Sequence, residues 1–498
     1  MDLGPIANPA LPTAGSRFLI RNVALAGSGP CDLRISDGRV AAIDRHLEPA
    51  PGEWLIAARG GALIHGLHDH HLHLFATAAA QQSVVCGPPQ VGNEQELEAA
   101  LLAGIVTAGQ WLRGVGFHDS VSSRLDRDWL DAVCPAPAVR IQHRSGMMWV
   151  LNSRALAALG IDRHRELPDG VERRADGELT GRIFALDAWL RERIQSSFPG
   201  LHRLSAELAR CGVTGVTDAG ARNGPAEWAA FAASRSRGEL MQRLLVMGSE
   251  QLLTQVADAN SWQRIGPLKI YLREAELPGL AALERRIAGT HRQGRNVAFH
   301  CVTRTELVYA LAALRGAGAS DGDRVEHAAI ADDHALEAMA ELGVTVVTQP
   351  HFIAERGAQY LADVDPGDHE LLYRCAGFLR HGVPLAAGSD APYGGLDPWA
   401  AMRAAVGRGT AEGVRIGCDE ALTPEQALDL YTGDPLRPGR ARPLIAVGSP
   451  ADLCLLDAPW ELVREDLDSG HVAATFCAGK ALFASPALAS ACETLRSQ

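Results

Sequence analysis

Lysine is almost absent from this chain of 498 residues, in which 45 of the 47 basic residues are arginine and only Lys269 and Lys480 are lysine. Aromatic residues make up 5% of the chain, no cluster of basic residues occurs, and the formal net charge is −12. Nucleic-acid binding needs a basic surface and often aromatic stacking platforms, so we expect no nucleic-acid partner. No apolar run reaches the ~20 residues of a membrane helix, so we expect no membrane partner either.

The ten cysteines are scattered and form no Cys-x-x-Cys pair. This pattern excludes zinc ribbons and is typical of reduced thiols in the cytosol. The first 15 residues contain neither a positively charged segment nor an apolar one, so we expect no signal peptide and a cytoplasmic location. Hydrophobic residues at 47% and charged residues at 21% indicate a globular chain with one large and one smaller domain.

Eight short apolar runs recur along the chain, and most of them precede a helix-like segment. This alternation predicts a parallel sheet, and eight such units favour an α/β fold of the (β/α)₈ barrel type over an open sheet. The first gap is too long for one crossover, which predicts a large insertion after barrel strand 1, at about 78–205. The predicted strands are 62–69, 212–219, 242–247, 267–272, 296–301, 324–327, 344–349 and 384–390.

The two ends of the chain have a different pattern. Residues 17–43 alternate like β-hairpins around a Ser36–Asp37–Gly38 turn, and residues 450–456 and 471–483 look similar. We therefore expect residues 1–60 and 440–498 to form one small discontinuous β-sandwich domain. Residues 61–439 would form the barrel with its insertion.

Five histidines are concentrated in the segment HGLHDHHLHL at the end of the first predicted strand. Residues two apart on a strand face the same side, so Asp69, His71 and His73 share one face. His71 and His73 can therefore converge on one metal ion. His68 and His70 would face the other way. A polar strand end without a ligand is the alternative interpretation of this segment alone.

Four further polar residues lie in or at the end of other predicted strands: Lys269, His300, His327 and Asp390. Their spacing fits barrel units of about 31 residues and assigns them to strands 4, 5, 6 and 8, toward the carboxyl face where such barrels do chemistry. Each one has a structural interpretation, such as a core histidine or a capping aspartate. Together they favour a metal site.

Lys269 lies inside an apolar strand, GPLKIYL, where burial should lower the pKa of its amine. A neutral buried amine can react with carbon dioxide to form a carbamate, an anion that can bridge two divalent metal ions. An ion pair with Glu274 or a neighbouring residue is the alternative. Lys480 lies in a turn near the C-terminus, where we expect a solvated side chain.

The segments HGLHDHHLHL, LKIY, VAFH, RVEH and GSDAP resemble the metal-binding motifs of the amidohydrolase superfamily. Stretches such as SDGRVAAI, LTPEQALDLYT and GSPADLCLLD are most similar to the subgroup typified by N-substituted formamide deformylase. The resemblance implies a divalent-metal cofactor of one or two ions, the second bridged by carbamylated Lys269. Zinc is expected, although nitrogen and oxygen ligands also allow iron or manganese. The implied ligands are His71, His73, Lys269, His300, His327 and Asp390.

Several loop positions depart from the pattern of these relatives. Arg273–Glu274 stands where they usually have Asp-Gly, and Thr303–Arg304 follows the strand-5 histidine where Gly-Asp is common. Gly146–Met147 replaces a usual Gly-His, and Ala185 a usual Glu. The resemblance therefore covers the metal ligands but not these loops.

The expected activity is hydrolysis of a non-peptide C–N bond in a small molecule, such as an amide, a cyclic amide or an N-acyl or N-formyl compound. A metal-activated hydroxide would attack, with Asp390 as general base and then acid. His351 would contact the carbonyl oxygen, unless it is a hydrogen-bonded loop histidine. Arg273 or Arg304 would bind a substrate carboxylate. Candidates for lining the pocket, with core packing as the alternative, are Met147, Met148, Trp149, Arg374 and Tyr393.

Two other functions are compatible with the sequence. A mononuclear aminohydrolase would deaminate a ring, but similar enzymes place a glutamate three residues after the strand-5 histidine, where this chain has Thr303. A non-catalytic scaffold on the same barrel would tend to lose metal ligands, and this chain keeps all six positions. The sequence leaves open whether the chain forms a homo-oligomer.

Overall fold

The computed structural model describes residues 16–494 apart from 26–28, 89, 106–110, 195–197, 256–259 and 491–492. Residues 1–15, on which the expectation of no signal peptide rests, lie outside this part. The chain divides into two compact units, unit 1 (residues 1–74 and 200–498) and unit 2 (residues 75–199). In the described part of the chain, every helix is too short or too polar to cross a membrane.

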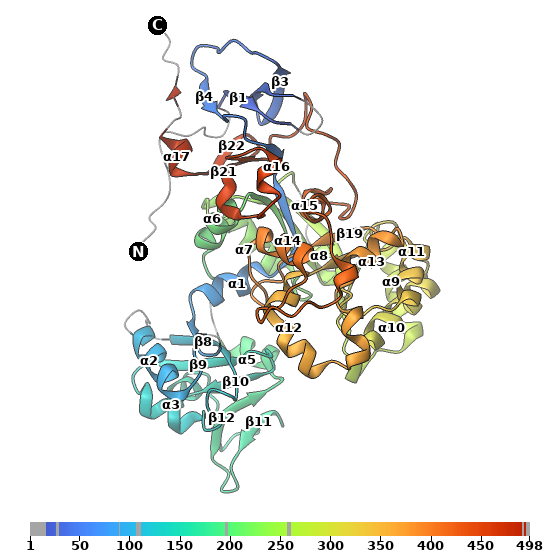
Figure 1. Ribbon diagram of the computed structural model, residues 1–498. Helices are drawn as coiled ribbons and strands as arrows, with labels where there is room; N and C mark the ends of the chain where they lie inside the picture. Colours follow the sequence, from blue (N-terminus) through green and yellow to red (C-terminus); the bar gives the residue numbers. More distant parts are fainter. Residues whose placement is uncertain are drawn as a thin grey trace. The chain divides into compact units, whose positions relative to one another are not determined.

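Unit 1 is built on an eight-stranded parallel sheet with the order β19-β18-β17-β16-β15-β14-β13-β6. It confirms the predicted (β/α)₈ fold, and each of its strands overlaps one of the eight predicted runs. Figure 1 labels the last of these strands, β19, and several of the helices that follow barrel strands. The strands are β6 (Leu67–Leu72), β13 (Val213–Asp218), β14 (Arg243–Gly248), β15 (Gln263–Tyr271), β16 (Val297–Cys301), β17 (Arg324–His327), β18 (Thr345–Thr348) and β19 (Leu385–Ala387).

Helices alternate with these strands along the chain, as the sequence predicts. The α-helices are α6 (His202–Arg210), α7 (Pro225–Ser236), α8 (Glu250–Gln255), α9 (Leu280–Arg292), α10 (Arg304–Ala317), α11 (Asp333–Leu342), α12 (His351–Asp363), α13 (Cys375–Arg380), α14 (Pro398–Gly407) and α15 (Pro424–Thr432). Three short 3₁₀ helices lie between them: η1 (Glu274–Glu276), η2 (Pro366–Leu371) and η3 (Cys418–Glu420).

Local sequence signals set the beginning and end of several helices. Thr303 and Glu306 form a capping box at α10, in which Thr303 Oγ1 accepts from the Glu306 N–H and the Glu306 carboxylate accepts from the Thr303 N–H. Asp332 caps α11 by accepting from the Ala335 N–H, and Gly343 ends that helix with φ 67°. These residues satisfy backbone groups that a helix terminus leaves unpaired.

The first and last barrel strands meet at a seam. Just beyond β19, the Asp390 N–H donates to the His71 carbonyl at 2.7 Å, and the His73 N–H donates to the Ala391 carbonyl at 2.9 Å. The Ser389 N–H also donates to Oδ1 of Asp69 at 3.0 Å. These bonds join residues of β6 to the segment after β19 and bring the barrel close to closure.

The two chain ends form two further sheets in unit 1, with strand orders β23-β4-β1-β2-β3 and β22-β21-β20-β5. The turn predicted at Ser36–Gly38 joins β2 and β3, with φ 52° at Asp37 and 72° at Gly38. Both ends contribute to one hydrophobic cluster that includes Phe18, Leu33, Leu453 and Phe476. The domain limits expected at residues 60 and 440 stay a prediction.

The elements of these chain ends are β1 (Phe18–Val23), β2 (Cys31–Ser36), β3 (Arg39–Asp44), β4 (Trp54–Ala57), β5 (Leu63–His65), β20 (Leu453–Leu456), α16 (Trp460–Val463), η4 (Ser469–His471), β21 (Val472–Cys477), β22 (Lys480–Ala484), α17 (Pro486–Ala489) and β23 (Glu493–Thr494). The side chain of Lys480 is exposed at the start of β22, as expected.

Unit 2 has its own six-stranded sheet, with the order β11-β12-β10-β9-β8-β7. It spans residues 75–199, in the region where we expect the insertion at about 78–205. Its elements are α1 (Leu74–Gln81, of which Leu74 belongs to unit 1), β7 (Val84–Val85), α2 (Glu94–Ile105), β8 (Trp111–Phe117), α3 (Arg127–Val133), β9 (Ala138–His143), β10 (Met148–Leu151), α4 (Ser153–Ala158), β11 (Val171–Arg173), β12 (Leu179–Phe184) and α5 (Asp187–Arg193).

Arg295 stabilises an irregular part of the barrel sheet. The register of β14 and β15 shifts between Val246 and Gly248, so nearby carbonyls lack regular ladder partners. The buried Arg295 guanidinium donates to the carbonyls of Gly248, Ser249, Gly266 and Pro267 at 2.7–3.2 Å. One side chain thus satisfies several buried acceptors.

We expect Arg295→Met to destabilise the protein by about 3 kcal/mol, because losing a charged donor leaves buried acceptors unsatisfied at roughly 1–3 kcal/mol each. Urea unfolding followed by tryptophan fluorescence measures the change. Arg292→Met, at an exposed position in α9, is the matched control. Equal unfolding midpoints for the two variants would contradict this role of Arg295.

Candidate metal centre

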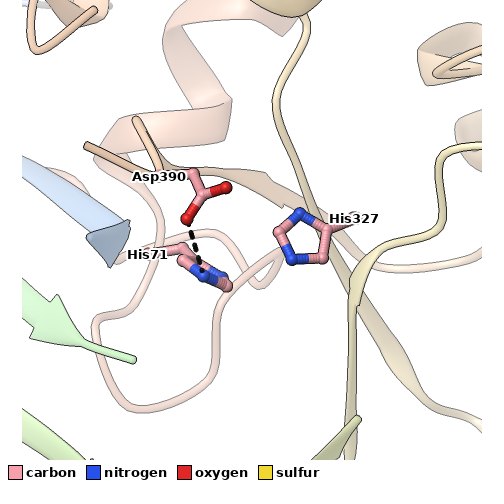
Figure 2. Close-up of side chains that lie close together, drawn as sticks. All are labelled: His71, His327 and Asp390. Atoms are coloured by element: carbon pink, nitrogen blue, oxygen red, sulfur yellow. Dashed lines mark ion pairs between the residues drawn. The ribbon is translucent and has the colours of Figure 1, made fainter. Parts of the chain in front are cut away.

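Three buried side chains converge at the carboxyl ends of the barrel strands of unit 1. His71 lies near the end of β6, His327 ends β17, and Asp390 follows β19. One ligand atom of each lies within 4.8 Å of the other two (Figure 2). Nε2 of His71 is 3.4 Å from Oδ1 of Asp390. Two imidazoles and a carboxylate form a donor set that zinc and related divalent metals bind.

His73 and His300 lie at the edge of this group. Nε2 of His73 is 3.3 Å from Oδ1 of Asp390, and its ring meets the ring of His71 edge-on, with 5.6 Å between centroids. The His300 ring centroid is 4.6 Å from that of His327. Among the described residues, only His71 and His327 join Asp390 in the group with metal-ligand spacing, while His73 contacts Asp390 and His300 contacts the ring of His327.

Hydrogen bonds orient the two buried histidines. Nδ1–H of His71 donates to Oε2 of Glu326, and Nδ1–H of His327 donates to Oε1 of Gln349 at 2.8 Å. Because Nδ1 donates its proton to an acceptor, Nε2 is the nitrogen that can bind a metal. Histidines that bind a metal usually have such a hydrogen-bond acceptor at their other ring nitrogen. The residues present therefore fit a divalent metal ion.

The backbone is unusual at the same place. His327 has φ 70° and Asp390 has φ 50°, in the left-handed region that costs free energy for residues other than glycine. The left-handed bend at His327 lets its side chain and that of Glu326 both contact the buried cluster, although adjacent strand residues normally face opposite sides. Such strain is often found at functional sites.

Lys269 is part of the same cluster. Its side chain is 3% exposed, and Nζ is 3.9 Å from Oε2 of Glu326. Among the described residues, Nζ has no hydrogen-bond partner. Burial lowers the pKa of this amine to about 8, against the opposing charge of Glu326. The Glu274 carboxylate accepts from Oγ1 of Thr305, so the alternative ion pair of Lys269 is formed not with Glu274 but with the neighbouring carboxylate of Glu326.

The carboxylates of the cluster are held in their charged form. Burial opposes ionisation of Glu326, but the charges of Arg324, Lys269 and His71 outweigh it and hold the pKa of Glu326 well below its usual range. Burial likewise opposes ionisation of Asp390, yet hydrogen bonds from Nε2–H of His71 and from His73 keep its pKa well below the ordinary value. Burial and the charge of Lys269 oppose protonation of His71, but Glu326 and Asp390 outweigh them and raise its pKa, so a metal ion at Nε2 would replace that proton. A bound cation would meet two negative charges here.

Two of the imidazoles are held neutral. Burial lowers the pKa of His327 to about 4, and burial together with the charges of His327 and Lys269 lowers that of His300 strongly. Neutral imidazole is the form that binds a metal ion.

The remaining histidines of HGLHDHHLHL and Asp69 have other partners. The His68 and His70 rings lie 4.5 Å apart, and Nε2 of His68 is 2.9 Å from Oγ1 of Thr217. Asp69 accepts the backbone N–H groups of His71 and Ser389. Burial raises the pKa of Asp69 to about 6. Asp69 thus positions backbone at the barrel seam.

His351, predicted to contact the substrate carbonyl, is buried at the start of α12. Its Nε2–H donates to the Ser389 carbonyl at 3.0 Å. This bond holds the segment that carries Asp390, which gives His351 a positioning role. Tyr393 lies nearer to the metal centre, since its ring meets the ring of His73 edge-on at 5.8 Å and is 47% exposed.

The three predicted arginines have different surroundings. Arg374 is buried and forms ion pairs with Glu420 and Asp333, so its guanidinium is used within the fold. Arg304 pairs with Asp368 at 2.5 Å. Arg273 is exposed beside Tyr271, with 5.4 Å between its guanidinium carbon and the centre of that ring.

The other predicted pocket residues belong to unit 2. Met147 is 40% exposed before β10, and Met148 is buried in that strand. Trp149 lies within cation–π distance of Arg113 and Arg140. A part for these three residues in substrate binding stays a prediction.

Sequence reasoning missed Glu326, Gln349 and Tyr271. The segment RVEH places Glu326 directly before His327, and strict alternation assigns it to the opposite side of the strand. Gln349 follows β18 in TVVTQPH, where its position at the carboxyl end of a barrel strand was an available signal.

Comparisons with known proteins identify the family of the chain. A model of the amidohydrolase family matches residues 55–483. N-substituted formamide deformylase of Arthrobacter pascens is 26% identical over 526 residues, covering 92% of this chain and 96% of that protein.

Solved structures share the fold. An uncharacterized metal-dependent hydrolase of Pyrococcus horikoshii has a TM-score of 0.74 at 21% identity, covering 92% of this chain and all of that one. An adenosine deaminase of Xanthomonas campestris with bound zinc has a TM-score of 0.54 at 17% identity, covering 94% of this chain and 93% of that one. Because the family match spans most of its length, the chain belongs to the amidohydrolase family.

Proposed function

We propose that this protein is a metal-dependent hydrolase that cleaves a non-peptide C–N bond in an amide, a cyclic amide or an N-acyl or N-formyl compound. The observation that carries the proposal is the convergence of His71, His327 and Asp390 within 4.8 Å, with Nδ1 of both histidines hydrogen-bonded to acceptors behind them. The similarity to a formamide deformylase over 92% of the chain supports the same bond type.

His71, His73, His300, His327 and Asp390 would hold the metal, which we expect to be zinc. A bound divalent ion supplies Lewis acidity and lowers the pKa of water from 15.7 toward about 7. Asp390 accepts a proton from the attacking water and passes it to the departing nitrogen, since its carboxylate is charged and lies beside two of the histidines. His351 keeps the Asp390 segment in place through the Ser389 carbonyl.

Lys269 would be carbamylated. The ammonium first releases one proton to solvent. The neutral Nζ then attacks the carbon of CO₂, an N–C bond forms as one C–O π bond opens, and a second amine proton leaves to solvent, so that the loss of two protons in all turns a cation into an anion. The buried position, the lowered pKa and the lack of a hydrogen-bond partner among the described residues favour this reaction. The carbamate would bridge a second metal ion.

A ring deaminase is the alternative within this fold. Such an enzyme needs a proton-shuttling carboxylate after the strand-5 histidine, and Thr303 caps α10 at that position. The nearby Glu306 is 6% exposed and accepts the backbone N–H groups of Val302 and Thr303. Its carboxylate is thus used in the helix cap, which favours amide hydrolysis. A non-catalytic scaffold is disfavoured by the intact donor set.

A substrate panel tests the proposal. Metal-loaded protein is incubated with N-formyl, N-acyl and cyclic amide compounds, and with aminated rings, and the products are separated by liquid chromatography. Release of carboxylate and amine, or ring opening, supports amide hydrolysis. Release of ammonia from the aminated rings alone would support the deaminase instead.

We expect protein purified without chelators to contain at least one divalent metal ion per chain, mostly zinc, as measured by inductively coupled plasma mass spectrometry. His71→Ala and His327→Ala should reduce the metal content, because each removes a ligand. His334→Ala, whose side chain is 95% exposed in α11, is the control. Metal-free wild-type protein would refute the site.

Asp390→Asn should keep at least one metal ion but lower kcat by about 10²–10⁴-fold, because the amide cannot accept the proton. Steady-state kinetics and metal analysis of the same preparation separate the two effects. Asp363→Asn, at an exposed position in α12, should leave both values unchanged. A near-normal kcat in Asp390→Asn would remove Asp390 from the mechanism.

Lys269→Ala and Lys269→Arg should each lose the second metal ion and most activity, since neither side chain can form the bridge. Short carboxylic acids should partly restore Lys269→Ala. Metal content, and ¹³C NMR of protein exchanged with labelled bicarbonate, report the carbamate directly. Lys480→Arg changes the only other lysine and is the matched control. Full metal content and rate in Lys269→Arg would show that the lysine is a structural cation.

A further inference from the structure

Three groups form a stack at one edge of the metal centre. The ring of Tyr271, the last residue of β15, lies nearly parallel to the ring of His300, with 4.2 Å between centroids and 27° between planes. The guanidinium carbon of Arg273 lies 5.4 Å from the centre of the Tyr271 ring. The distance from the guanidinium carbon to the centre of the His300 ring is therefore at most the sum of these two distances.

This stack is accessible. Tyr271 is 52% exposed, which is unusual for an aromatic side chain in contact with a candidate metal ligand. Arg273 is exposed as well. An exposed aromatic face and a cation beside it form a surface that a planar, negatively charged molecule can contact.

Arg273 has no carboxylate partner among the described residues, whereas its neighbours do have partners for their charges. Arg304 pairs with Asp368 and Asp332. The Glu274 carboxylate, next to Arg273 in the chain, accepts from Oγ1 of Thr305. The Arg273 guanidinium also hydrogen-bonds the side chain of Tyr271, which leaves other N–H groups of its planar fork for the two oxygens of a carboxylate.

We infer that the substrate has a negatively charged group, a carboxylate on a planar or aromatic scaffold, which Arg273 binds while the exposed part of the Tyr271 ring contacts the scaffold. This inference rests on the proposed function, because it assigns the substrate class of the same site. Arg273 thereby selects anionic C–N substrates over neutral ones.

A binding experiment tests the inference without turnover. Isothermal titration calorimetry measures 4-methylbenzoate and neutral 4-methylbenzamide against metal-loaded wild type, Arg273→Met and Arg273→Lys. We expect Arg273→Met to bind the benzoate roughly tenfold more weakly than the wild type does, and the benzamide equally, because a charge-assisted bidentate hydrogen bond is lost. Arg273→Lys should fall between them.

Two further variants control for charge and position. Arg315→Met removes an exposed arginine of α10 that pairs with Glu341 of α11, and this variant should bind the benzoate like the wild type. Arg304→Met tests the other candidate arginine. Equal benzoate affinity in Arg273→Met and wild type, a loss that follows Arg304→Met instead, or no benzoate binding at millimolar concentration would overturn the inference.

Kinetics separate this inference from the proposed function. The matched substrates are N-formyl-4-(aminomethyl)benzoate and its methyl ester, which differ by one negative charge. Arg273→Met should lower kcat/KM for the acid roughly tenfold and leave that for the ester unchanged. If neither compound is hydrolysed while benzoate binding depends on Arg273, the proposed function fails and the anion site stands. If both are hydrolysed equally well by wild type and Arg273→Met, the anion site fails and the function stands.

Discussion

The buried carboxylate of Glu326 is the interaction on which the rest of the centre depends. The side chain has no solvent exposure, and its two oxygens contact Arg324, His71 and Lys269. An unpaired buried charge is costly, and breaking a buried ion pair by removing one partner costs about 3–5 kcal/mol. Glu326 therefore ties together strands β6, β15 and β17, which carry three of the predicted metal ligands.

The same carboxylate links stability to chemistry. Arg324 donates to both Glu326 oxygens at 2.7 and 3.1 Å and also donates to the His70 carbonyl at 2.8 Å. These bonds fix the position of Glu326, which in turn orients the His71 ring. Gln349 orients the ring of His327 as Glu326 orients the ring of His71, but the amide of Gln349 carries no charge. The metal centre is thus organised by the fold before any ion binds.

The barrel was predictable from the sequence because its strands are short apolar runs at regular spacing, and because ligand-type residues end several of them. The face of a regular strand on which each side chain lies was also predictable. What the sequence could not give was the effect of local irregularity, since the left-handed backbone at His327 brings Glu326 into the cluster against strict alternation. Pairing between distant segments, such as β4 with β23, also leaves no local signal.

The arginines predicted to contact substrate show a second limit of prediction from the sequence. Arg273 and Arg304 are equivalent in the sequence, where each is a cation just after a barrel strand, whereas Arg374 lies in the long connection between the last two barrel strands. The three-dimensional surroundings distinguish all three, because Arg374 and Arg304 have acidic partners from distant segments and Arg273 has an aromatic ring.

The seam between β6 and the segment after β19 has a consequence for how the protein folds. Asp69 and Ser389 are 320 residues apart in sequence, yet their hydrogen bond and those of His71 and His73 close the barrel. Closing so long a loop carries an entropic cost that grows slowly with length. Since His71 and Asp390 lie on the two sides of this seam, the donor set is complete only when the seam is formed, and a metal ion bound there would act as a crosslink that keeps the first and last strands together.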